Sequence, residues 1–376
     1  MRGGTSKAVF LDGGSLPAEG PARDATILAL FGSPDPRQID GLGGADLLTS
    51  KLAIIDPPSR SDADLDYTFA QVSITEPKVD YDINCGNISA AVGAYAVDEG
   101  IVDVVEPVTV VRIHNTNTGR ILRAEVPILD GAAAIEGDYV VHGVPGSGAP
   151  IALDFSQTAG GITGSLLPTG NVVDQLDTSI GTVSATIVDL ANLTVFFHAS
   201  AVGMTGSEGP AEFTKEHLEA VMSVKEAAAV LLGMATDGLT PVPAIVSPPA
   251  RYTSFATGET VEADDIDLLA RVVGGRPPVL HKAYPGTLAA CTGVAARIPG
   301  TTVHDVARRS SESYDLAIGH TSGVMPVRAR VSDDGGSFRV DEAVYHRTAR
   351  RIAEGTAFVR NVVAPDDQER SPDEAQ

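Results

Sequence analysis

Two segments, one near residue 90 and one near residue 290, carry small or apolar residues on nearly every side of a helix. The first reads Cys85-Gly86-Asn87-Ile88-Ser89-Ala90-Ala91-Val92-Gly93, and the second reads Pro285-Gly286-Thr287-Leu288-Ala289-Ala290-Cys291-Thr292-Gly293. Glycine or alanine coincides at Gly86 and Gly286, Ala90 and Ala290, Gly93 and Gly293, and Ala96 and Ala296. A helix without a polar face must be buried on all sides. The chain is therefore expected to form two similar halves, each wrapping strands around a central helix.

The rest of the chain favours strands over helices. Short alternating apolar stretches at 51–55, 108–113, 185–188 and 193–197 predict strands, and Gly, Pro, Asn and Asp turns separate them. Helices are expected at 88–99, 215–232, 263–272, 286–297 and 303–307. This mixture predicts an α+β fold, because βαβ units would alternate strands and helices more regularly.

The length of 376 residues suits two domains of ordinary size. We place the first at 1–176 plus 353–376 and the second, pseudo-symmetric with it, at 177–352. The acidic stretch 365–376 is expected to be a solvated, disordered end.

Composition excludes several classes of partner. A net charge of −22 and the absence of Trp argue against nucleic acid. No apolar run is long enough to cross a membrane, and the first residues lack the apolar core of a signal peptide, so a cytoplasmic location is expected. Histidine and cysteine spacings fit no metal site, and no Gly-x-Gly-x-x-Gly follows a strand, so we expect neither metal nor nucleotide cofactor.

Cys85 is the first candidate for chemistry. It would stand at the N-terminus of the first buried helix, where unpaired backbone N–H groups favour anions and thiols ionise readily. Asn84, Gly86 and Asn87 surround it with polar or small groups. The alternative is a buried cysteine that acts as a small hydrophobe, and Cys291, within an Ala-rich helix, fits that description better.

Lys51 is the second candidate, at the start of an apolar strand. A lysine desolvated by such neighbours has a lowered pKa and can act as a base. Most lysines at strand ends are solvated, so the position alone leaves both readings open.

A series of motifs resembles the PrpF-like family. They are Arg2-Gly3-Gly4-Thr5-Ser6-Lys7, Gly41-Leu42-Gly43-Gly44, Thr49-Ser50-Lys51, Cys85-Gly86-Asn87, Asn115-Thr116-Asn117-Thr118, Leu167-Pro168-Thr169-Gly170-Asn171, Met204-Thr205-Gly206-Ser207-Glu208 and Gly319-His320-Thr321-Ser322-Gly323-Val324-Met325-Pro326-Val327. That family includes 2-methylaconitate cis-trans isomerase, methylitaconate Δ-isomerase and 4-oxalomesaconate tautomerase. Two departures are Ala8, where glycine is common, and Thr321 in place of proline. The chain also begins at Met1-Arg2, whereas relatives usually carry several more residues at the start of a first strand, so we expect either a misassigned start codon or one short strand.

The resemblance implies a fold like that of diaminopimelate epimerase, with the active site between two similar domains. It also implies that the family's Lys and Cys pair falls on Lys51 and Cys85. Expected substrate contacts are Thr5, Ser6, Gly86, Asn87, Lys282, Gly286, Thr287, His320, Ser322 and Gly323.

The function expected is a cofactor-independent isomerase, or tautomerase, that moves a C=C bond in a small unsaturated di- or tricarboxylic acid. Lys51 would be the base and Cys85 the proton donor or relay. A diaminopimelate-type epimerase is the first alternative, but it would need an acid at Pro285, which has no proton to exchange. A non-catalytic binding protein is the second. A homodimer stays open.

Overall fold

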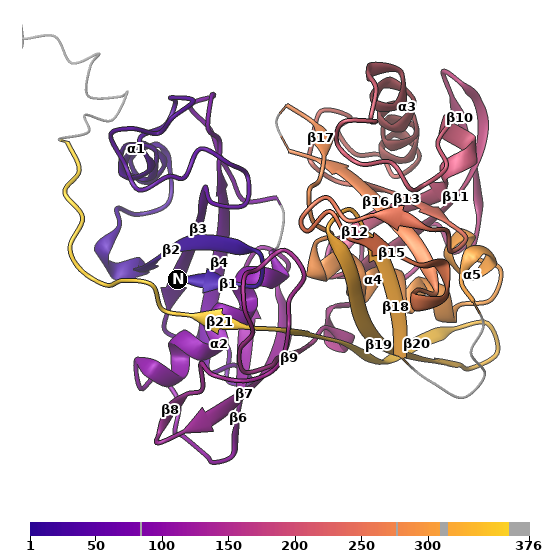
Figure 1. Cartoon of the computed structure of the whole chain (residues 1–376). Helices are drawn as coiled ribbons and strands as arrows, with labels where there is room; N and C mark the ends of the chain where they lie inside the picture. Colours follow the sequence, from indigo (N-terminus) through magenta and orange to yellow (C-terminus); the bar gives the residue numbers. More distant parts are fainter. Residues whose placement is uncertain (83–84, 276, 309–314, 361–376) are drawn as a thin grey trace, which may run out of the picture.

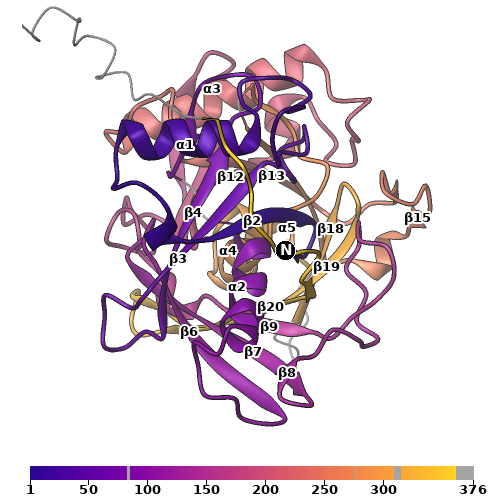
Figure 2. The same ribbon diagram turned by 90° about the vertical axis from the view of Figure 1, so that its left-hand side faces the viewer.

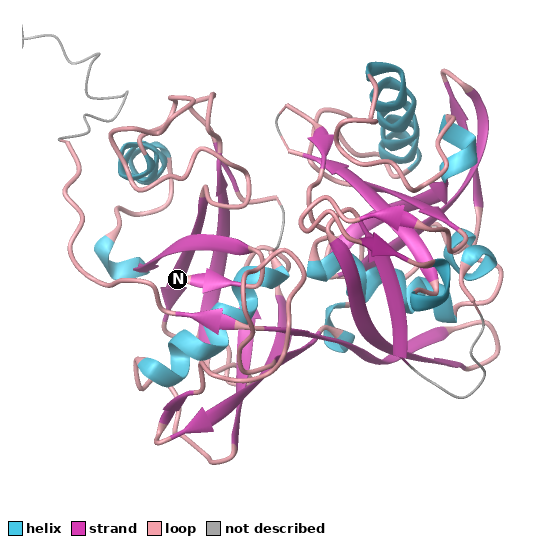
Figure 3. Ribbon diagram, in the orientation of Figure 1, coloured by secondary structure: helices cyan, strands magenta, loops and turns pink. Residues whose placement is uncertain are grey.

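The computed structural model describes residues 1–82, 85–275, 277–308 and 315–360. Two lobes lie side by side, the first from the N-terminal part of the chain and the second from the C-terminal part (Figure 1). Strands and loops make up most of both lobes (Figure 3). The predicted α+β class is confirmed.

The first lobe is built on strands in the spatial order β1–β2–β3–β4–β6–β7–β9. Neighbours are antiparallel, except that β2 runs parallel to β3 and β4 parallel to β6. The bounds are β1 (Arg2–Gly3), β2 (Ser6–Asp12), β3 (Lys51–Asp56), β4 (Leu65–Val72), β6 (Val108–Asn115), β7 (Arg120–Leu129) and β9 (Ile151–Asp154), with the short β8 (Ala132–Ala133) beside β7. A short strand on the edge of β4, β5 (Val79–Asp80), precedes helix α2 (Gly86–Asp98).

The second lobe repeats this plan in the order β11–β12–β13–β16–β18–β19–β20. Again two pairs are parallel, β12 with β13 and β16 with β18. The bounds are β11 (Gly181–Leu190), β12 (Asn192–His198), β13 (Val242–Ser247), β16 (Leu268–Gly274), β18 (Asp315–His320), β19 (Gly323–Asp333) and β20 (Phe338–Arg347); β10 (Asp174–Thr178) flanks β11, and β14 (Tyr252–Thr253) pairs with β15 (Thr260–Val261). The short β17 (Val279–Leu280) lies on β16 and precedes helix α4 (Gly286–Arg297).

The helices obey the same repeat. Helix α1 (Pro21–Phe31) connects the parallel strands β2 and β3, and α3 (Lys215–Leu231) lies between the parallel strands β12 and β13. Both lie on the upper side of their lobes, outside the strands, in two perpendicular views (Figures 1 and 2). The prediction of two similar halves is thus confirmed element by element.

Both central helices are buried, as their composition predicts. Every residue of α4 from Gly286 to Ala296 is buried, and so is α2 up to Val97 apart from Tyr95. Small side chains let the surrounding strands approach: a Cβ on Gly93 would stand 2.8 Å from the Cβ of Ala124 on β7. The expected helices at 88–99 and 286–297 are therefore confirmed with their environment.

A seam joins the two lobes. Strand β9 pairs antiparallel with β20, so the sheets of the two halves are continuous. Immediately after β20, β21 (Ala349–Arg350) pairs with β1 in the first lobe. The chain thus returns to the first lobe at 349–350, and β10 crosses the predicted junction at 176; the domain boundaries given above stay a prediction.

One expected helix is wrong. Residues 263–272 form a 3-10 turn over Ala263–Asp265 followed by strand β16. The run from Leu268 to Val273 is apolar apart from Arg271 and is buried throughout, because β16 lies between β13 and β18. A central strand covered on both faces lacks alternation and cannot be told from a buried helix by its pattern.

The other expected helices are found at α3 and at α5 (Thr302–Val306), whereas α1 was not expected. The acidic stretch 365–376 and Asn84 lie outside the described residues. Within the described ranges, no helix is both long and apolar enough to span a bilayer.

The N-termini of α2 and α4 meet at one side chain, which generates a stability prediction. Tyr345 of β20 is buried, and a Cβ on Gly286 would stand 2.3 Å from its ring, too close for any side chain. Gly286→Ala should therefore lower the free energy of unfolding by about 1–3 kcal/mol through overpacking. The control is Gly14→Ala, where a Cβ meets its nearest atom at an ordinary 3.4 Å. Equal midpoints of thermal unfolding for the two variants would contradict the packing argument.

Candidate active site

A cavity lies between the lobes where the N-termini of α2 and α4 meet. Six of the predicted site residues line it from the first lobe, namely Thr5, Ser6, Lys51, Cys85, Gly86 and Asn87. Gly286 lines it from the second lobe, next to Pro285. Both helices present their first turns to this space, so their unpaired N–H groups favour an anionic ligand here.

Lys51 is the buried cation of the cavity. It is the first residue of β3 and only 5% exposed, and its ammonium lies 5.1 Å from the centroid of the Phe69 ring. Burial lowers the pKa of Lys51, and the nearby Cys85 and Asp46 offset part of that effect. The side chain is thus brought closer to the neutral form that a general base requires.

Gln71 holds Lys51 in place and was not found from the sequence. The Lys51 ammonium donates a 2.6 Å hydrogen bond to Gln71 Oε1. The Gln71 amide donates to the carbonyl oxygens of Ser50, at 2.8 Å, and Leu47, at 3.3 Å, which fixes its oxygen toward the lysine. The signal that could have revealed it is cross-strand register, since Gln71 on β4 stands opposite Lys51 on β3.

Cys85 is the N-cap residue of α2, as expected. Its side chain accepts no hydrogen bond from the backbone N–H groups of the helix. The sulfur instead lies 4.0 Å from Ser6 Oγ. Asn87, the second residue of α2, donates from Nδ2 to Thr5 Oγ1 at 3.0 Å and to Ser6 Oγ at 3.4 Å. The N-terminal motif and the start of α2 therefore form one polar wall.

The second lobe forms the opposite wall of the cavity, and it carries apolar residues at the positions that correspond to Cys85 and Lys51. Pro285 caps α4 at the position that Cys85 holds on α2, and Val242 begins β13 as Lys51 begins β3. Both line the cavity. The two halves thus share a backbone plan, but among the described residues that line the cavity the amines and the thiol all come from the first lobe.

His281 is a titratable group of this second wall, and it too was missed from the sequence. It is partly buried, and burial, followed by the charge of Lys51, lowers the pKa of His281 to about 4. Its imidazole is therefore neutral at neutral pH and adds no second positive charge beside Lys51.

Comparison with known proteins identifies the family of this chain. The model of the PrpF protein family matches residues 1–360. The chain belongs to the PrpF family. It is 51% identical over 369 residues to 3-methylitaconate isomerase of Eubacterium barkeri, covering 96% of each chain, and 40% identical over 384 residues to 2-methyl-aconitate isomerase of Shewanella oneidensis, covering 96% of this chain and 95% of that one.

Solved structures give the same answer. A crystal structure of methylitaconate-delta-isomerase superposes with a TM-score of 0.80 at 51% identity, covering 95% of this chain and 94% of that one. A probable proline racemase from Agrobacterium radiobacter, 15% identical with a TM-score of 0.52 over 92% of this chain and 88% of that one, shares the fold alone. The predictions of a PrpF-type fold and of an isomerase are confirmed.

Four expected substrate contacts lie away from the cavity of this PrpF protein. Lys282 is 54% exposed and forms a 3.3 Å ion pair with Asp46 across the outer edge of the cleft. Three residues where β18 turns into β19, namely His320, Ser322 and Gly323, are buried beside His142 and Lys282, and the Ser322 hydroxyl donates to the Lys282 carbonyl oxygen. Among the described residues that line the cavity none of the four occurs, and their contact with substrate stays a prediction.

Thr287 is placed differently again. It is the second residue of α4 and fully buried, and its hydroxyl accepts a 3.0 Å hydrogen bond from Asn192, whose side chain does reach the cavity. Its backbone N–H belongs to the first turn of α4, whereas its side chain supports Asn192.

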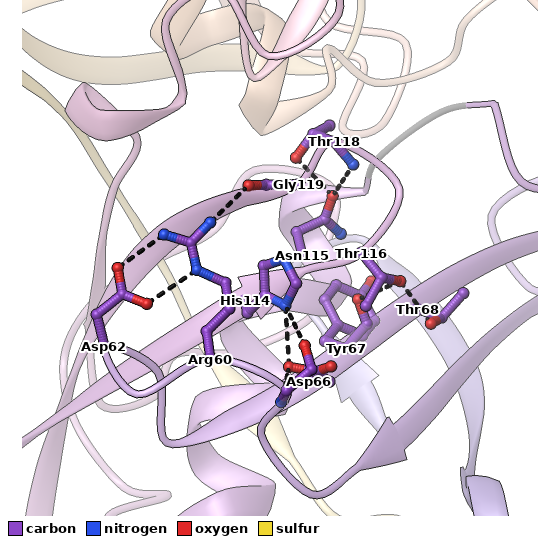
Figure 4. Close-up of polar contacts among 11 residues, drawn as sticks. Arg60, Asp62, Asp66, Tyr67, Thr68, His114, Asn115, Thr116, Thr118 and Gly119 are labelled. Atoms are coloured by element: carbon purple, nitrogen blue, oxygen red, sulfur yellow. Dashed lines mark hydrogen bonds and ion pairs between the residues drawn. The ribbon is translucent and has the colours of Figure 1, made fainter.

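The motif Asn115-Thr116-Asn117-Thr118 shapes the first lobe and does not enter the cavity. Asn115 Oδ1 accepts from the N–H and hydroxyl of Thr118, at 3.1 and 2.9 Å, which closes the turn between β6 and β7 (Figure 4). Asn117 accepts from the N–H of Phe69 and donates to the carbonyl oxygens of Phe69 and Tyr81. This PrpF motif therefore links β4, which pairs with the strand that begins at Lys51, to Tyr81 in the segment before Cys85.

Among the described residues, no group of three or more His, Cys, Asp or Glu side chains is arranged to hold a metal ion. The remaining charged groups at the cavity are Lys78 and Asp80, which pair at 3.3 Å.

The contact between Lys51 and Gln71 predicts a change in pH dependence. Gln71→Glu puts a carboxylate beside the ammonium, which favours the protonated lysine and raises the pKa of Lys51. Activity that needs the neutral amine should then rise at higher pH than in the parent, with a loss of about tenfold or more at neutral pH. The measurement is kcat/KM against pH. The matched control, Gln175→Glu at an exposed position of β10, should leave the profile unchanged.

Proposed function

We propose that this PrpF protein moves a carbon–carbon double bond in a small unsaturated di- or tricarboxylic acid. The observation that carries the proposal is the meeting of a buried lysine, a helix-capping cysteine and two helix N-termini in one cavity. The relatives named above act on acids of this class, which supports the choice of substrate.

The reaction requires removal of a weakly acidic allylic proton and return of a proton at the far end of the allyl system. Neutral Lys51 takes the proton from the C–H carbon, and the electron pair moves into a dienolate. The Cys85 thiol then gives its proton to the other end, so the double bond has shifted by one position. Transfer of a proton from the Lys51 ammonium to the Cys85 thiolate restores both groups.

The negative charge of the dienolate collects on a carboxylate oxygen, which needs fixed donors. Backbone N–H groups at Gly86 and Asn87 on α2, and at Gly286 and Thr287 on α4, belong to the first turns of their helices. Such groups stabilise an anion without reorganising, because their orientation is set by the helix. In this proposal one substrate carboxylate binds at each helix.

Epimerisation by two acids is less well supported. The counterpart of Cys85 is Pro285, and Cys291 lies two turns deeper in α4, where its sulfur is 3.8 Å from the carbonyl oxygen of Val188. Burial raises the pKa of Cys291 to about 12, so it stays a thiol. A second acid on the opposite face would have to come from another kind of side chain.

The two cysteines should respond differently to substitution. Cys85→Ser should lower kcat by about a hundredfold or more, because a hydroxyl is a much poorer proton donor at this position. Cys291→Ser should keep kcat and lose about 1–3 kcal/mol of stability from burying a hydroxyl. Steady-state kinetics and thermal unfolding of both variants provide the comparison. Equal losses of kcat in the two would favour the two-acid alternative.

Isotope incorporation tests the bond shift itself. In deuterated water, incubation with methylitaconate, methylaconitate, oxalomesaconate or aconitate should yield, for the accepted acid, a product with a moved double bond and solvent deuterium at the new C–H carbon, as seen by NMR. Exchange with inversion at one carbon and no bond shift would overturn the proposal.

A further inference from the structure

Arg347 is a buried cation that the reaction scheme above does not use. It is the last residue of β20, at the seam between the lobes, and is 2% exposed. In the part of the chain that the structure describes, no carboxylate pairs with it. A buried charge without an opposite charge is costly unless other polar groups bind it.

The guanidinium is instead bound by neutral groups. Its Nε donates a 2.7 Å hydrogen bond to Asn87 Oδ1, one terminal nitrogen donates to the His346 carbonyl oxygen at 2.8 Å, and the other contacts Met325 Sδ at 2.9 Å. Its carbon lies 4.8 Å from the centroid of the Tyr345 ring. Of these partners, only Asn87 reaches the cavity.

The bond from Arg347 decides which end of the Asn87 amide faces the cavity. Because the guanidinium has no acceptor, it can bind only the amide oxygen. The amide NH2 is thereby turned to the hydroxyls of Thr5 and Ser6 on the cavity wall. Gly4 leaves the space for this pair, since a Cβ there would stand 2.3 Å from Asn87 Oδ1 and 2.7 Å from Arg347 Cδ.

We propose that Arg347 is a positioning residue that acts through Asn87. It holds the Asn87 NH2 group so that both N–H bonds go to the hydroxyl oxygens of Thr5 and Ser6, which leaves the protons of these two hydroxyls to be donated to a carboxylate bound at the start of α2. The inference rests on the proposed function for the identity of the ligand. In this proposal a residue of the second lobe, Arg347 on β20, orients the side chain of Asn87 on the first lobe.

Asn87→Asp separates this role from a merely structural one. The new carboxylate has the shape of the amide and pairs with Arg347, so the midpoint of thermal unfolding should rise. The NH2 donor is lost at the same time, and the hydroxyls of Thr5 and Ser6 then donate to the new carboxylate and not to the ligand, so kcat/KM and the affinity for trans-aconitate should each fall about tenfold or more. If the contact only stabilised the fold, a higher midpoint of unfolding would come with unchanged or higher activity. An unchanged or lower midpoint, or a higher midpoint with full activity, would overturn the proposal.

A double-substitution cycle tests whether Arg347 acts through Asn87. Arg347→Lys keeps the charge but cannot reproduce the fixed Nε–H bond, so kcat/KM should fall about tenfold in the parent. In an Asn87→Ala background the same change should cost less than threefold, because the group to be oriented is gone. Additive losses would show that Arg347 acts elsewhere. The matched control is Arg328→Lys, on the neighbouring strand β19, where Arg328 pairs with Asp315 on the surface. It should leave kcat/KM unchanged both in the parent and in the Asn87→Ala background.

The thermal measurement needs no substrate, which keeps this inference distinguishable from the proposed function. If the parent turned over none of the four acids, the proposed function would fail. The rise of the midpoint in Asn87→Asp, and its loss when Arg347→Met is added, would still decide whether the two residues pair. Calorimetric titration with trans-aconitate would then decide whether the amide orientation matters for binding a polycarboxylate.

Discussion

The close approach of two buried helices at their N-termini is the constraint on which the rest of this molecule depends. Helices α2 and α4 are surrounded by strands, so their first-turn N–H groups can be satisfied only at the place where the sheets leave an opening. That opening is the cavity. Gly86 and Gly286 allow the approach, because Tyr345 occupies the space that side chains would need. An anion site is thus a consequence of burying two helices end to end.

The repeated plan of the two lobes explains why the chemistry is asymmetric. A duplicated backbone provides two equivalent strand starts and two equivalent helix caps. In the first lobe these positions hold the ionisable residues Lys51 and Cys85, whereas in the second lobe they hold Val242 and Pro285, whose side chains have no proton to exchange. In the proposed reaction both reacting groups belong to the first lobe, which leaves binding and orientation of the substrate to the second. Two of its described residues at the cavity, His281 with its lowered pKa and the apolar Val242, add no positive charge beside Lys51 under neutral conditions.

The sequence predicted those features that depend on local pattern. The central helices could be recognised because small residues on all faces leave burial as the only option, and the pairing of Lys51 with Cys85 followed from family motifs. Residues 263–272 were assigned wrongly because a strand covered on both faces has no alternation. Gln71, His281 and Arg347 could not be found because their roles arise from strand register or from contacts between lobes, over separations such as the 260 residues between Asn87 and Arg347.

The pairing of β1 with β21 has a consequence for how the protein is made. Arg2 donates hydrogen bonds to the carbonyl and hydroxyl oxygens of Thr348, across 346 residues of chain, and the strand ending at Gly3 has its partner at 349–350. The polar wall formed by the first residues and α2 therefore lacks its support until the end of the sheet has been synthesised. On the ribosome, the first lobe emerges early with a central helix and most of its strands, yet its side of the cavity is among the last parts to be assembled. A newly made chain thus gains a completed cavity only when both lobes are present.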